Sequence, residues 1–140
     1  MEPNRETCFE ILNYNANLFL TLPLWVRDDK EMVLAALMGE HVLQYTSERM
    51  RNDEEVVMAF GSMFGWNLEH ASERLRDNME IVLAAINQYE FSLRYASERL
   101  RNDENVVFTA VSTCGETIIY ASDRLRDNKN IQNAAAHGAG

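Results

Sequence analysis

Residues 95–103 read Tyr95-Ala96-Ser97-Glu98-Arg99-Leu100-Arg101-Asn102-Asp103, and closely similar sequences occur at 45–53, 70–78 and 120–128. The serines of the four copies are Ser47, Ser72, Ser97 and Ser122, a constant interval of 25 residues. A fixed period of this length is the signature of a repeat protein, in which neighbouring units stack to bury a continuous core. The sequence therefore predicts an array of stacked 25-residue units.

The repeat organises residues 1–140 as one helical repeat domain. Four units are expected at 29–52, 53–77, 78–102 and 103–127. Residues 1–28 form a degenerate first unit, in which Pro23 stands where the other units have serine, and residues 128–140 begin a partial C-terminal unit. A unit at the end of an array lacks one neighbour, so we expect both terminal units to act as caps.

Each unit is predicted to contain two or three short helices. Apolar residues at 106, 107, 110 and 111 share one helical face, and Asp103 stands three residues before that face, where it can cap the helix. A second helix follows, and Ser97 is placed to start a further helical turn inside it. Gly65 and Gly115 are expected to end the first helix in a left-handed conformation. The fold class predicted is all-α, an α-solenoid-like helical repeat array.

The composition restricts the classes of partner. The chain is 46% hydrophobic and 25% charged, which is typical of a folded domain, and its formal net charge is −9. This charge argues against binding to nucleic acids and anionic membranes, because both require clustered Lys and Arg. Apolar runs fall short of the ~20 residues of a membrane span, and the N-terminus lacks a secretory signal pattern. We therefore expect a protein of a reducing, cytoplasmic compartment.

Regularly spaced serine and arginine side chains are the most prominent polar feature. They are Ser47, Ser72, Ser97 and Ser122 with Arg49, Arg74, Arg99 and Arg124, and a second arginine follows each of the first. Repeated guanidinium groups suit an anion-binding stripe. However, acidic residues bracket every arginine pair, so we favour a structural ladder of salt bridges and hydrogen bonds between units.

Catalytic and metal-binding chemistry have no visible place in the sequence. His41, His70 and His137 fall at unrelated positions of the repeat, and Cys8 and Cys114 lack the spacing of metal ligands or the partners of a nucleophile. We expect both thiols to be buried. The prediction is a protein without enzymatic activity, cofactor or metal.

Departures from the repeat give the candidates for partner binding. Met63, Phe64 and Trp66 cluster at a turn where other units are less aromatic, and Tyr89 lies at the equivalent turn of the next unit. Aromatic and methionine side chains often anchor protein interfaces. The alternative is that these side chains fill the core between units.

The motif at 95–103, followed in other copies by Glu-x-Val-Val-x-x-Ala, resembles the repeats of the family called domain of unknown function 4116. The resemblance covers roughly residues 29–131 and implies a helical repeat array with an interaction role, without any catalytic residue. Glu90 departs from it where glycine is usual, as does Gly61 inside a first helix.

The function expected from these observations is a protein–protein interaction module on a helical scaffold. A structural subunit of a larger assembly is the alternative, and an enzyme or a small-ligand binder ranks last. Repeat scaffolds commonly hold partners on their variable surfaces, so this expectation rests on architecture.

Overall fold

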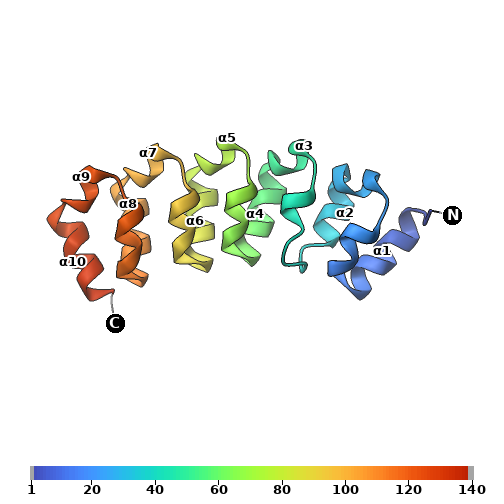
Figure 1. Cartoon of the computed structure of the whole chain (residues 1–140), viewed down its shortest axis with the longest axis horizontal. Coiled ribbons are helices and arrows are strands. Elements are labelled where there is room, and N and C mark those ends of the chain that lie inside the picture. The colour runs from blue at the N-terminus through green and yellow to red at the C-terminus, as the bar shows by residue number, and fades with distance from the viewer. Residues whose placement is uncertain (1, 139–140) are drawn as a thin grey trace.

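The computed structural model describes residues 2–138, which form an all-α helical repeat array (Figure 1). Its α-helices are α1 (Arg5–Tyr14), α2 (Lys30–Ala35), α3 (Glu48–Arg51), α4 (Glu54–Met63), α5 (Glu73–Arg76), α6 (Met79–Gln88), α7 (Glu98–Arg101), α8 (Glu104–Thr113), α9 (Asp123–Arg126) and α10 (Lys129–His137). Its 3₁₀-helices are η1 (Ala16–Thr21), η2 (Leu24–Asp28), η3 (Leu43–Tyr45), η4 (Gly65–His70), η5 (Glu90–Tyr95) and η6 (Gly115–Tyr120). Across residues 2–138, the helices lack the length and apolar composition of a membrane-spanning segment.

A regular unit contains three helices, each of a different length. In the unit that begins with α4, a ten-residue α-helix is followed by the six-residue 3₁₀-helix η4 and the four-residue α-helix α5. Successive units stand side by side in a bowed row, with the short helices α3, α5, α7 and α9 along the outer edge (Figure 1). The 3₁₀-helices face the viewer and the long helices lie behind them, so the array has a 3₁₀ face and a long-helix face.

Polar side chains begin the helices as the sequence predicts. The Asp103 carboxylate accepts a hydrogen bond from the amide of Val106 at 3.1 Å, and Asp53 and Asn78 cap α4 and α6 in the same way. The Ser97 hydroxyl accepts from the amide of Leu100 at 3.2 Å and starts α7. Each such cap stabilises its helix by about 1 kcal/mol.

The left-handed conformation predicted for Gly65 and Gly115 does not occur, because no residue between 2 and 138 has a positive φ. The long helices end instead at residues with extended backbone, such as Phe64 at φ −138°, and a 3₁₀-helix starts immediately afterwards. Gly65 is required for space: a Cβ there would lie 2.4 Å from the carbonyl oxygen of Ala85 in the next unit. A Cβ at Gly115 would likewise lie 2.0 Å from the carbonyl oxygen of Ala135.

The hydrophobic core runs along the array between the helices. Val56 and Phe60 of α4 belong to the cluster shared with preceding units, whereas Val57 belongs to the cluster shared with following units. One helix therefore buries apolar side chains in both directions, each worth up to roughly 1.5–3 kcal/mol. On α10 the forward-facing positions hold Gln132 and Ala136, which are exposed, so the end of the array is less apolar than its interior.

Candidate functional site

A ladder of hydrogen bonds joins the units along the outer edge. The backbone amide of Ser97 donates to the carbonyl of Arg76 at 2.9 Å. The Ser97 hydroxyl and Arg99 Nε both donate to Asp77 Oδ1, at 2.6 and 2.9 Å, and Arg99 Nη2 donates to the Asp77 carbonyl at 2.8 Å. One rung thus supplies four hydrogen bonds between adjacent units.

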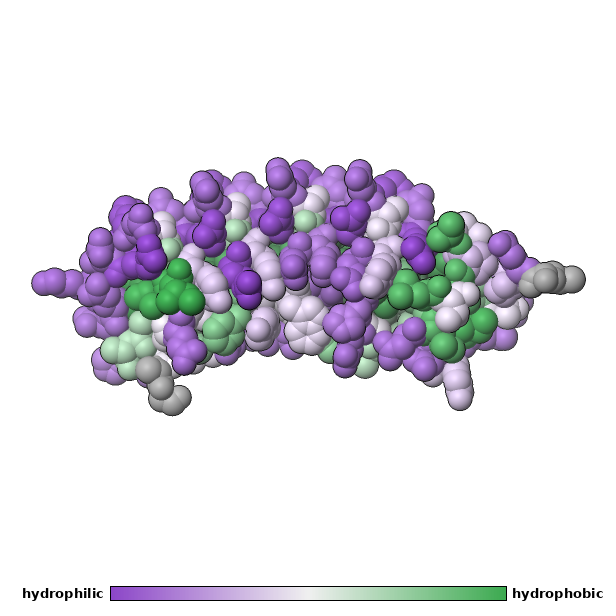
Figure 2. All heavy atoms as spheres, viewed as in Figure 1, coloured by the Kyte–Doolittle hydropathy of each residue, from purple (hydrophilic) through white to green (hydrophobic). Residues whose placement is uncertain are grey.

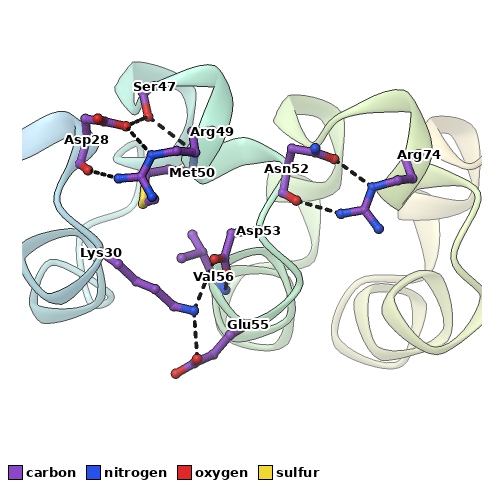
Figure 3. A network of polar contacts seen from close by, with 10 residues as sticks. All are labelled: Asp28, Lys30, Ser47, Arg49, Met50, Asn52, Asp53, Glu55, Val56 and Arg74. Carbon is purple, nitrogen blue, oxygen red and sulfur yellow. Dashed lines mark hydrogen bonds and ion pairs between the residues drawn. The ribbon is translucent and has the colours of Figure 1, made fainter.

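The same rung recurs at every junction from Asp28 to Arg124. Figure 3 shows two successive rungs: Ser47 and Arg49 donate hydrogen bonds to Asp28, and Arg74 donates to Asn52. Ser72 completes the rung on Asn52, and Ser122 and Arg124 bind Asn102 with hydroxyl and Nε distances of 2.7 and 3.0 Å. All eight serine and arginine side chains singled out in the sequence therefore lie in contacts between units.

Sequence reasoning missed the acceptors of the ladder, which alternate between aspartate and asparagine. Asp28 and Asp77 are charged acceptors, whereas Asn52 and Asn102 are neutral. Glu54 restores a carboxylate at the Asn52 rung, where it lies 3.2 Å from Arg74. This two-unit alternation is visible in the sequence once the acceptor position is known.

Charge makes the aspartate rungs sensitive to protonation. Hydrogen bonds from Ser97 and then Arg99 hold the pKa of Asp77 below its ordinary value of 3.8. Ser47 and Arg49 lower the pKa of Asp28 for the same reason. Both carboxylates are solvent-exposed, so each contributes little to stability at neutral pH.

A row of aromatic rings crosses three units at the inner edge and on the 3₁₀ face. Phe64 stacks on Trp66 with ring centroids 4.9 Å apart, and Trp66 meets the edge of Tyr89 at 6.2 Å. Tyr89 then contacts Phe91 at 5.7 Å, and Phe91 contacts Tyr120 at 6.4 Å. We call these five residues the aromatic row. Its rings are fixed by one another, which limits the entropy lost on binding a partner.

The structure places the four candidate partner-binding side chains together, and all four are half-buried. Trp66 contacts both Phe64 and Tyr89, and Met63 precedes Phe64 at the end of α4. The indole Nε1 of Trp66 is buried without a hydrogen-bond partner among the described residues. These side chains therefore pack between units and also border the surface.

Two large apolar side chains of the 3₁₀-helices are exposed. Ile119 of η6 is 62% exposed and Tyr45 of η3 is 42% exposed. In Figure 2 the outer edge is strongly hydrophilic, while hydrophobic patches appear toward both ends of this face. The Arg94 guanidinium lies over the rings of Tyr95 and Tyr120, at 5.2 and 5.6 Å, and adds a cation to the row.

Titratable groups outside the ladder form no cluster suited to a metal. Among residues 2–138 no three His, Cys, Asp or Glu side chains are placed to hold an ion. Cys8 is buried, and burial raises the pKa of its thiol, whereas Cys114 is half-buried, contrary to the expectation of two buried thiols. Burial also lowers the pKa of His70, a half-buried side chain of η4.

Comparison with known families identifies the repeat. A family model described as "Domain of unknown function (DUF4116)" matches residues 38–76, 62–101 and 78–126, which together span more than half of the chain. The chain belongs to the DUF4116 family. Each DUF4116 match contains two successive serines of the ladder. Comparison with curated proteins and with solved structures gives no significant match.

Proposed function

We propose that this DUF4116 protein is a non-catalytic interaction module that holds another protein against its 3₁₀ face. The observation that carries the proposal is the aromatic row, in which four successive ring contacts link three units. Large aromatic groups are the side chains most often found at the energetic centre of protein interfaces.

The surroundings of the row support docking of a protein surface. Ile119 precedes Tyr120 of the row in η6, Tyr45 belongs to η3 of the unit before Phe64, and both side chains are exposed. The ladder holds successive units in a fixed relation along the outer edge, so the row is presented on a scaffold that needs little rearrangement. A preorganised, partly apolar face of this kind binds with a small loss of conformational entropy.

Two matched variants test which face is used. Ile119→Glu places a charge beside the aromatic row, and Phe108→Glu places the same charge on α8, where Phe108 is 51% exposed on the long-helix face. Both side chains are exposed, so both variants are expected to fold, which circular dichroism checks. Each chain is then used as bait in a native lysate beside the parent, and the bound proteins are compared by mass spectrometry.

The expected result is a protein that the parent and Phe108→Glu retain and that Ile119→Glu loses. Retention by both variants, or loss from both, contradicts docking on the 3₁₀ face. If no protein binds the parent, the interaction proposal itself fails. In that case the aromatic row serves only to pack the units together.

A further inference from the structure

Arginine side chains from two successive units line the groove between α7 and α9. It has a volume of about 730 Å³ and lies open on the outer edge of the array.

Four arginines and two carboxylates line the α7–α9 groove: Arg99, Arg101, Arg124, Arg126, Glu98 and Asp123. Cations therefore outnumber anions there, on a protein whose formal net charge is −9.

Two of these arginines have no carboxylate partner among the described residues. Arg99 pairs with Asp77, and Arg126 pairs with Asp123. Arg124 instead binds the two oxygens of neutral Asn102, and Arg101 Nε donates to the backbone carbonyl of Ala96 at 3.2 Å.

In the equivalent groove between α3 and α5, the positive charge of the arginine on the asparagine rung is balanced by a carboxylate. There Glu54 lies 3.2 Å from Arg74. Glu104 occupies the position of Glu54 two units later, but its Oε1 accepts a hydrogen bond from Asn128 Nδ2 at 3.1 Å. The Asn102 rung is therefore left with uncompensated positive charge, which is specific to this end of the ladder.

We propose that the groove between α7 and α9 binds a phosphate group, held by Arg101 and Arg124. Guanidinium groups match phosphate oxygens with paired, charge-assisted hydrogen bonds. Two unpaired cations suit the dianionic charge of a phosphate monoester better than the single charge of a carboxylate. The acidic remainder of the surface repels long polyanions, so the ligand is an isolated phosphate.

The first test follows the arginine Nε–Hε signals by NMR while inorganic phosphate replaces chloride at constant ionic strength. The expected result is a saturable shift of the Arg101 and Arg124 signals. Linear shifts of equal size at all arginines would overturn the proposal, because they would report only general ionic effects.

Asn102→Asp is the most informative variant, because aspartate already fills the equivalent position at Asp28 and Asp77. The new carboxylate is expected to neutralise Arg124 and weaken phosphate binding by about tenfold or more, with the fold retained. Unchanged phosphate affinity in this variant would contradict the proposal.

Arg101→Gln and Arg51→Gln form a matched pair. Each parent side chain donates from Nε to a backbone carbonyl at 3.2 Å, so the structural cost of the two substitutions is comparable. Only Arg101→Gln is expected to lose the phosphate-dependent shifts. Equal losses in the two variants would argue against a site between α7 and α9.

The source of the phosphate is distinguished by competition. A short peptide carrying one phosphoserine is added to the phosphate-bound protein, beside its unphosphorylated form. Displacement by the phosphopeptide alone assigns the site to a phosphorylated segment, whereas binding of inorganic phosphate alone assigns it to a small phosphate compound. Ile119 also lines this groove, so these readings are taken on chains that keep Ile119. They need no protein on the 3₁₀ face and therefore test the phosphate site separately from the proposed function.

Discussion

Asp77 and Asn102 occupy equivalent places in the ladder and make the same hydrogen bonds, yet only Asp77 is charged. The serine and the arginine of a rung use one Oδ1 and one backbone carbonyl, which both residue types supply. The choice between the two therefore changes the charge of a rung while its geometry is preserved.

Asp77→Asn is expected to fold normally and to alter the pH dependence of stability. Because the pKa of Asp77 is lowered in the folded state, its stabilising contribution is present above 3.8 and is lost as the pH falls through the folded value. The gap in unfolding free energy between parent and variant should therefore close in acid. Urea denaturation at several pH values measures it, and a gap that is independent of pH would contradict the explanation.

Gly65→Ala and Gly61→Ala should have opposite effects. A Cβ at Gly65 would collide with the Ala85 carbonyl, so a loss of about 1–3 kcal/mol is expected. A Cβ at Gly61 meets only the Ala85 Cβ at 3.9 Å, and alanine favours the helix by up to about 1 kcal/mol. Thermal unfolding of both variants tests this. A stable Gly65→Ala variant would show that close approach does not explain that glycine.

The long helices and their caps could be predicted from the sequence, because apolar spacing and capping residues are local signals. The type of the second helix could not be predicted. A six-residue segment is too short to distinguish the three-residue period of a 3₁₀-helix from the 3.6-residue period of an α-helix. Asn67 and Thr117 are buried in these 3₁₀-helices and donate to carbonyls at 3.1 and 2.7 Å. The aspartate and asparagine acceptors of the ladder could not be predicted either, because they bind side chains of the next unit and a local sequence pattern does not show which residues meet between units.

Ser97→Ala removes both the cap of α7 and one bond of the ladder. A loss of about 0.5–2 kcal/mol is expected from the cap alone. Ser112→Ala, at an exposed position of α8, is the matched control and should change stability little. Chemical denaturation compares the two, and equal stabilities would mean that the ladder serine contributes nothing measurable.

A side chain of α10 takes over one bond of the ladder at the last described unit of the array. Gln132 Nε2 donates to the Arg126 carbonyl at 2.8 Å, where earlier units receive the amide of the next serine. Val107 and Val111 are buried at the positions that Gln132 and Ala136 occupy in α10. The end of α10 therefore lacks the apolar face that joins units elsewhere.

Restoring that face should promote association between molecules. The double variant Gln132→Val, Ala136→Ile exposes an apolar surface like the one buried between α8 and α10, and self-association through it is expected. Sedimentation velocity over a range of concentrations measures the effect. A variant that sediments as the parent does at every concentration would show that these two side chains do not limit stacking.

The close approach of Gly65 to Ala85 also bears on the shape of the array. The ladder sets the distance between units along the outer edge, whereas contacts such as this one set it along the inner edge. Curvature follows from the difference between the two distances. A single side chain at the inner turn can thus flatten or tighten the bow while the ladder is unchanged, which makes the curvature of such an array adjustable one junction at a time.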